Sequence, residues 1–142
     1  MSVRSVQELK QTLLQAGFEV FRTLGSRVVL ADRVRENLIM DSCVSVVCED
    51  ALGVRVVIRA QGADFPGETE EQLFDRVVRH GAGLGQRGYE EVERSVVPML
   101  DPSDPSKRLD TWYEVSFGRK LAADQDLGGE LRFVLAFTKV VA

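Results

Sequence analysis

The chain has 142 residues, of which 44% are hydrophobic and 28% are charged, and its formal net charge is −4. This length suits one domain with a core of its own, so we expect residues 1–142 to form a single domain. The negative charge argues against sequence-specific nucleic-acid binding, and no apolar segment has the length of a membrane span.

The N-terminal segment and the cysteines bear on the cellular compartment. The segment MSVRSVQELKQ, residues 1–11, lacks the apolar run of a signal peptide. Cys43 and Cys48 are too few for a disulfide framework, and on one strand this spacing would point them to opposite faces. We therefore expect reduced thiols, a buried Cys48 beside Val44 and Val46, and a cytoplasmic protein.

A helix is predicted at the start of the chain. Ser5 and Glu8 have the spacing of a capping box, and Gly17 suits the position just after the helix. The apolar residues that recur on one helical face are Val6, Leu9, Leu13 and Ala16.

Two β-hairpins are predicted after this helix. Their strands cover residues 19–24, 27–31, 43–49 and 53–60. Gly25 and Ser26 can form the first tight turn, and residues 50–52 the second. In the last of these strands the side chains alternate between the two faces, with Val54, Val56 and Ile58 on one and Arg55 and Arg59 on the other.

A second helix is predicted to begin near Thr69, with Gln72 as the reciprocal capping partner and Gly81 at its end. Its apolar side consists of Leu73, Phe74, Val77 and Val78.

The rest of the chain is predicted to form strands. They cover 89–99, 110–118 and 130–141, with loops at 101–107 and 122–129. Strands joined by short turns pair antiparallel, so the order α-ββ-ββ-α-βββ predicts an α+β fold. We expect mainly antiparallel sheet of about six or seven strands, with two helices packed on one face. The other face needs cover, and a partner subunit is one candidate.

Residues 81–88, GAGLGQRG, contain the spacing G-x-G-x-x-G of a phosphate-binding loop. A dinucleotide site needs these glycines after a strand and before a helix, whereas here a helix precedes them and a strand follows. The segment is therefore predicted to be a mobile connection capped by Gly81. A loop that becomes ordered against a partner is a second hypothesis.

No residue set in the sequence is typical of an active site or a metal centre. His80 is the one histidine, and we expect it to be solvated at a helix end. Asp101, Asp104 and Asp110 lack the spacing of a calcium-binding loop and are expected to be solvated carboxylates. We expect no catalytic residue, no cofactor and no metal. A ligand-binding or enzymatic α+β domain is the third alternative.

Trp112 lies on the strand face that also carries Glu114 and Ser116. An aromatic residue among polar neighbours is more typical of packing or an interface than of a ligand platform. Trp112 is therefore the first candidate for a subunit contact.

The order of segments in the chain carries a family resemblance. A strand VRVVIRAQG (54–62) leads into a helix TEEQLFDRVVRHG (69–81). A strand VERSVVPMLDPSD (92–104) then ends at a proline and an acidic loop, and an aromatic-bearing strand RLDTWYEVSFGRKL (108–121) returns. This order resembles the tail-terminator or tail-completion (minor tail) proteins of long-tailed bacteriophages.

The first half of the chain is compatible with this resemblance. The leading helix and GSRVVLADRVRENLIMDSCVSVVCED (25–50) are similar to the family's first helix and following strands. The predicted last strand, 130–141, departs from the pattern, because many small members end without it.

The resemblance implies a viral structural protein without catalytic residues. It would be a homo-oligomeric ring, usually of six subunits, that caps the tail tube and prepares it to join the head. The implied partners are other copies of the chain and tail-tube or neck proteins, and the implied location is the virion or the host cytoplasm. Strand edges and loops are natural contacts in a ring. The candidate interface residues are Trp112, Arg55, Arg59, Leu84, Gln86 and Arg87.

The alternative is a small acidic binding chaperone similar to those of type III secretion. Such proteins also begin with a helix, continue with strands and form acidic dimers. They usually carry a further helix near the C-terminus, where this chain has a strand pattern.

Overall fold

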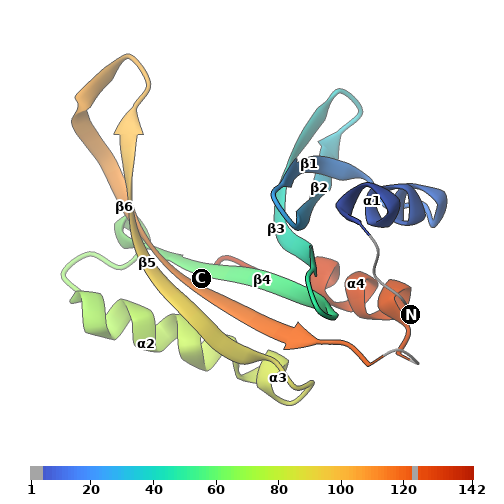
Figure 1. Cartoon of the computed structure of the whole chain (residues 1–142). Helices are drawn as coiled ribbons and strands as arrows, with labels where there is room; N and C mark the ends of the chain where they lie inside the picture. Colours follow the sequence, from blue (N-terminus) through green and yellow to red (C-terminus); the bar gives the residue numbers. More distant parts are fainter. Residues whose placement is uncertain (1–4, 123–124) are drawn as a thin grey trace. The chain divides into compact units, whose positions relative to one another are not determined.

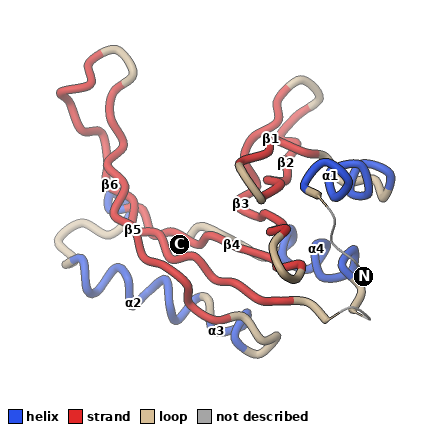
Figure 2. The backbone as a smooth tube through the Cα atoms, viewed as in Figure 1, coloured by secondary structure: helices blue, strands red, loops and turns tan. Residues whose placement is uncertain are grey.

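A computed structural model describes residues 5–122 and 125–142. Within these residues the fold is α+β, with a six-stranded antiparallel sheet and four helices (Figures 1 and 2). The elements are α1 (Val6–Gln15), β1 (Val20–Leu24), β2 (Arg27–Arg35), β3 (Leu38–Cys48), β4 (Leu52–Gln61), a 3-10 turn η1 (Gly62–Asp64), α2 (Glu70–His80), α3 (Ala82–Gly85), β5 (Glu90–Asp101), β6 (Asp104–Lys120) and α4 (Leu127–Ala136). The strand order is β1-β2-β3-β4-β6-β5, so β1 and β5 are the edge strands.

The chain divides into two compact units. Unit 1 comprises Met1–Val56 and Gly118–Phe137, and unit 2 comprises Val57–Phe117 and Thr138–Ala142. The boundaries fall inside β4 and β6, so each of these strands contributes residues to both units. The single domain expected from the chain length stays a prediction.

In unit 1, α1 lies against β1 and β2 and buries Leu9 and Leu13. Ser5 begins this helix as predicted, because its hydroxyl oxygen accepts a hydrogen bond from the Glu8 backbone N–H at 3.1 Å. Gly17 follows the helix with a φ of +93°, a conformation that favours glycine. The predicted N-cap at Ser5 and the predicted helix end are confirmed.

The predicted last strand is wrong, because residues 127–136 form the helix α4, which contacts β3. The near-continuous apolar run fits both a strand and a helix. In the structure the buried residues follow the helical spacing: Leu127, Glu130, Leu131 and Val134. Arg119 Nη1 lies 3.2 Å from the buried Glu130 carboxylate and ties the helix to β6. The loop expected at 122–129 is likewise shortened, and its residues 123–124 lie outside the described part of the chain.

β2 and β3 are longer than the strands predicted at 27–31 and 43–49, and they form a hairpin that was not predicted. Its strands continue to Arg35 and resume at Leu38, and residues 32–41 are all exposed. β1 pairs with β2 only from Arg27 to Leu30. Beyond that point β2 pairs with β3 alone among the described residues.

Both cysteines lie on β3. Cys43 has a φ of +65°, and its backbone N–H donates to the Asp41 carboxylate at 2.7 Å, at the place where the β2–β3 register shifts. Cys48 ends the strand and is half-buried rather than buried as expected, because the chain turns towards β4 immediately after it.

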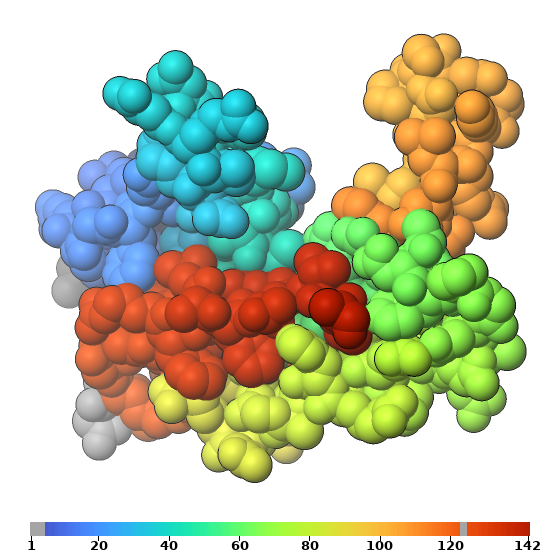
Figure 3. Space-filling view, turned by 180° about the vertical axis from the view of Figure 1, so that it is seen from behind, coloured from blue at the N-terminus to red at the C-terminus, as the bar shows by residue number. Residues whose placement is uncertain are grey.

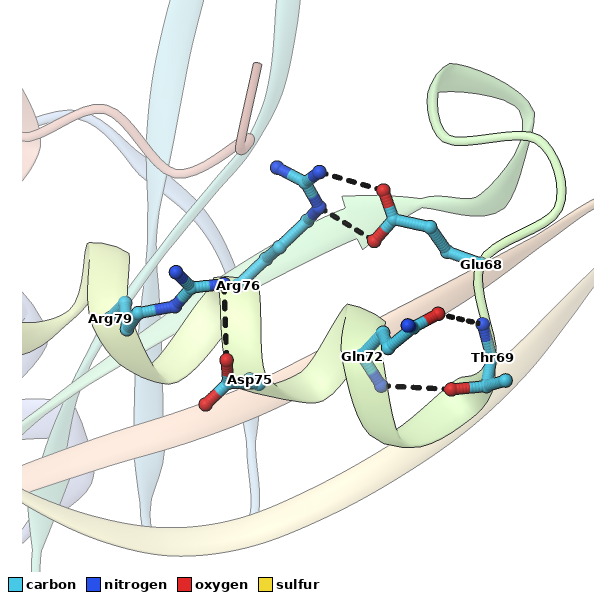
Figure 4. A network of polar contacts seen from close by, with 6 residues as sticks. All are labelled: Glu68, Thr69, Gln72, Asp75, Arg76 and Arg79. Atoms are coloured by element: carbon cyan, nitrogen blue, oxygen red, sulfur yellow. Dashed lines mark hydrogen bonds and ion pairs between the residues drawn. The ribbon is translucent and has the colours of Figure 1, made fainter.

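In unit 2, α2 covers one face of the sheet. The predicted capping box is present: Thr69 Oγ1 accepts from the Gln72 N–H at 3.2 Å, and Gln72 Oε1 accepts from the Thr69 N–H at 2.8 Å (Figure 4). The helix buries Leu73, Phe74 and Val77. The Phe74 ring meets the Tyr113 ring of β6 edge to face, with centroids 5.6 Å apart, a contact worth about 1 kcal/mol beyond its buried area.

The glycine segment is not a simple connection. Residues 82–85 form the helical turn α3, and Leu84 within it is fully buried. Gly81 joins α2 to α3 with its α-carbon against the ring of Phe117 on β6. Gly88 has a φ of +94° and turns the chain into β5. The glycines therefore serve close packing and a turn.

The loop expected at 101–107 is also wrong, because strand structure runs through most of it. β5 extends to Asp101 and β6 begins at Asp104, so only Pro102 and Ser103 form the turn. The result is a long two-stranded hairpin that extends from the rest of unit 2 (Figure 3).

The last residues of the chain complete one edge of β4. Arg59 N–H donates to the Lys139 carbonyl at 2.8 Å, and Val141 N–H donates to the Arg59 carbonyl at 2.9 Å. These residues form a parallel bridge, centred on Val140, to the part of β4 that lies beyond its pairing with β3, which ends at Val56.

We predict that Gly81→Ala lowers the free energy of unfolding by about 1–3 kcal/mol, because a Cβ there would lie 2.6 Å from a Phe117 ring carbon. Gly85→Ala is the matched control, since a Cβ at Gly85 meets no atom within 4 Å. It should leave stability unchanged or raise it by up to about 1 kcal/mol. Urea unfolding followed by circular dichroism measures both, and equal losses would contradict the packing role of Gly81.

Candidate interaction surface

Two predicted interface residues, Arg59 and Trp112, meet a third residue, Glu114, on the face of the unit 2 sheet that α2 leaves uncovered. The guanidinium carbon of Arg59 lies 4.1 Å from the centroid of the Trp112 ring. Arg59 Nη2 also lies 3.3 Å from the Glu114 carboxylate. The alternation of β4 and β6 places these side chains opposite the buried face that carries Ile58 and Val115. We call Arg59, Trp112 and Glu114 the sheet-face cluster.

The sheet-face cluster is partly shielded from water. The side chains of Arg59 and Glu114 are 17% and 21% exposed, and Trp112 is half-buried. A stacked guanidinium gains about 0.5–2 kcal/mol from the ring, depending on how far it is desolvated. The cluster thus combines a stacked aromatic ring and an ion pair in a partly buried position.

The β5–β6 hairpin exposes large apolar side chains. Val96 and Leu100 on β5 are each 46% exposed, and Leu109 on β6 is 56% exposed. β5 alternates between exposed and half-buried residues over 94–101, so one of its faces is open there and the other is only partly covered. Apolar side chains gathered on an extended hairpin are typical of a contact surface.

The β2–β3 hairpin of unit 1 has the same character. Val34, Leu38, Ile39 and Met40 are all more than one third exposed, and they lie at or next to its turn. Basic residues flank Val34 in the sequence Arg33-Val34-Arg35.

A hollow lies at the start of α2 in unit 2. Phe65, Leu73, Tyr113 and Leu109 provide its apolar lining. Arg76 stacks on Phe65, with 4.3 Å from the guanidinium carbon to the ring centroid. The hollow is shallow and open to solvent, so it adds an apolar depression at the base of the β5–β6 hairpin.

A bidentate ion pair fixes the loop before α2. Arg76 donates to both carboxylate oxygens of Glu68, at 2.6 and 2.7 Å (Figure 4). These hydrogen bonds hold the pKa of Glu68 below its ordinary value, and Glu68 raises the pKa of Arg76. Two carboxylates at the tip of the β5–β6 hairpin also have lowered pKa values. Hydrogen bonds from the Ser103 and Ser106 hydroxyls lower the pKa values of Asp101 and Asp104, respectively.

The remaining predicted interface residues have different environments. Arg55 shares a β4 face with Arg59 and is half-buried. Gln86 and Arg87 are exposed in the turn after α3. Leu84 needs correction, because it is 0% exposed and belongs to the core rather than to an accessible surface.

Two other sequence expectations concern polar groups. His80 is half-buried rather than solvated, and its Nε2 donates to the Thr138 carbonyl oxygen at 2.7 Å. Asp110 accepts hydrogen bonds from the Ala63 and Thr111 backbone N–H groups and so joins η1 to β6.

Residues 5–122 and 125–142 contain no group of three or more histidine, cysteine or acidic residues that could hold a metal ion. Among them no helix is both long and apolar enough for a transmembrane segment.

Sequence reasoning missed the exposed apolar residues of both hairpins. In β5 the signal is present, because RSVVPML places apolar residues on both strand faces while one helix can cover only one. In the β2–β3 hairpin, the polar residues on both sides of Val34 prevented the prediction of a strand there.

Comparisons with protein-family models, with curated proteins and with solved structures find no match. The function proposed below therefore rests on the residues themselves and on the resemblance in segment order.

We predict that the Glu68–Arg76 pair stabilises the protein at neutral pH and not in acid. The folded state lowers the pKa of Glu68, so its contribution is complete above the ordinary glutamate pKa, about 4.3, and is lost as the pH falls through the lower folded value. Glu68→Gln should therefore be less stable than wild type at pH 7, and the difference should vanish in acid. Urea titrations from pH 7 to pH 2.5 test this, and a pH-independent difference would contradict it.

Proposed function

We propose that this chain is a non-enzymatic assembly protein, a tail-terminator-like subunit that joins copies of itself into a ring on a tail tube. The observation that carries the proposal is the β5–β6 hairpin, which extends from the rest of unit 2 (Figure 3) and exposes the side chains of Val96, Leu100 and Leu109. These side chains lose water only if another chain covers them. Apolar burial of this kind contributes roughly 25 cal/mol per Å².

The second hairpin supports the same proposal. The β2–β3 hairpin brings Val34, Leu38, Ile39 and Met40 to solvent in unit 1. A protein with two different exposed strand surfaces suits head-to-tail contacts, in which one surface of each copy meets the other surface of the next copy. Such contacts form rings when the rotation between copies closes.

A small acidic binding chaperone is the second candidate, and α4 favours it. The sequence separated the two candidates by a strand pattern near the C-terminus, but residues 127–136 are helical. A chaperone of this kind would form a two-chain assembly through one self-complementary surface. The number of chains in the assembly therefore discriminates between the two proposals.

We predict that the purified protein self-associates into a closed assembly, six chains being the number that the resemblance implies. Light scattering coupled to size exclusion measures the number of chains. The double variant Leu100→Gln/Leu109→Gln should weaken association by at least about tenfold, because it removes apolar area from the contact.

Leu14→Gln is the control, since Leu14 is a comparably exposed leucine, 43%, on α1. It should associate like wild type. A strict monomer at high concentration, with or without tail-tube protein, would overturn the proposal. A strict dimer would favour the chaperone.

A further inference from the structure

Two strand edges lack a strand partner among the described residues over part of their length. β5 is an edge strand of the sheet, so its outer row of backbone N–H and C=O groups is open. β2 is open on the β1 side over residues 32–35, because β1 pairs with it only as far as Leu30. Open edges of this kind are templates for pairing with another chain.

The open parts of these edges are short and defined. Pro98 lacks an N–H donor and limits the part of β5 that can pair to the residues before it. In that part, residues 90–94 are all exposed, as are residues 32–35 of β2. The two segments are the β5 edge, Glu91-Val92-Glu93-Arg94, and the β2 edge, Asp32-Arg33-Val34-Arg35.

We propose that copies of this chain join edge to edge, the β5 edge of one copy pairing antiparallel with the β2 edge of the next. This inference rests on the self-association proposed above and names its contact. With Val92 opposite Val34, Arg35 lies opposite Glu91 and Arg33 opposite Glu93. The same register places Arg94 opposite Asp32.

The register gives favourable side-chain contacts on both faces of the joined sheet. Val34 and Val92 are 50% and 47% exposed, and they would cover each other on one face. The arginine and glutamate pairs fall on the opposite face. Opposite charges directly across two strands stabilise the pairing, whereas like charges destabilise it. The occupant is a second copy because the chain itself supplies both complementary segments.

Some of these charges already have partners within the chain. Arg33 binds Glu19 at 2.8 Å, and Glu91 binds Arg94 at 2.7 Å. Glu93 and Arg35 have no side-chain hydrogen bond or ion pair with another described residue. Their charges are therefore available to the neighbouring copy. Arg35 and Glu91, which lie directly opposite each other in this register, are the residues to reverse.

The contact is heterologous, because the β5 edge and the β2 edge are different surfaces. Every copy that uses its β5 edge still has an open β2 edge. Addition therefore continues until the ring closes, whereas a self-complementary contact would stop at two chains.

Charge reversal tests the pairing. Glu91→Arg puts three basic residues together across the contact, and Arg35→Glu puts three acidic residues together. Each single variant should weaken self-association by about tenfold or more in sedimentation velocity. The double variant Glu91→Arg/Arg35→Glu, and an equimolar mixture of the two single variants, should recover association to within about threefold of wild type, because the arginine introduced at position 91 then lies opposite the glutamate introduced at position 35.

Asp64→Arg is the control, an exposed acidic residue in η1 that belongs to neither edge segment, and it should associate like wild type. Circular dichroism establishes that each variant is folded. A second measurement does not depend on charge: with Cys43→Ser and Cys48→Ala as background, Val34→Cys and Val92→Cys chains should form disulfide-linked pairs when mixed and not separately.

The outcomes separate this inference from the proposed function. Wild-type assembly that resists both charge reversals and yields no cross-link would overturn the edge pairing and leave the assembly function standing. A strictly monomeric wild type would overturn both. Recovery in the mixture together with the 34–92 cross-link supports the pairing.

Discussion

The helix that covers the unit 2 sheet is much shorter than the strands beneath it. The eleven residues of α2 extend over about 16 Å, whereas the seventeen residues of β6 extend over about 56 Å. One helix can therefore bury only part of one sheet face. Tyr113, Val115 and Phe117 lie under or near the helix, and the rest of the hairpin keeps its apolar residues in water. This mismatch in length places the candidate contact surface at the hairpin.

The sequence predicted what depends on near neighbours in the chain. The capping residues of α1 and α2 act within three positions, so Ser5 and Thr69 located both helix starts. The predicted strand at 130–141 failed because its apolar run satisfies a period of two as well as a helical period, and packing against β3 selects the helix. Leu84 was wrongly predicted to be an interface residue for a related reason. Its burial arises from tertiary packing, which cannot be inferred from the spacing of the neighbouring glycines.

The candidate surface could be predicted only in part. Arg59 and Trp112 were found from strand alternation, and the structure brings them into contact. The exposed hairpin residues were missed because Pro102 and Asp104 indicated a loop, whereas the chain turns within two residues and continues as strand. A proline next to a tight turn and a proline in a long loop have the same local sequence signal, and only the pairing of β5 with β6 distinguishes them.

Trp112 is the only tryptophan of the chain, and it lies in unit 2. Its indole is held under the guanidinium of Arg59, in a partly dry environment. Ultraviolet emission excited at the red edge of protein absorbance therefore comes from this one ring. The tryptophan fluorescence of the protein therefore reports on the surroundings of Trp112 in unit 2, and unit 1 contributes no tryptophan to the same signal.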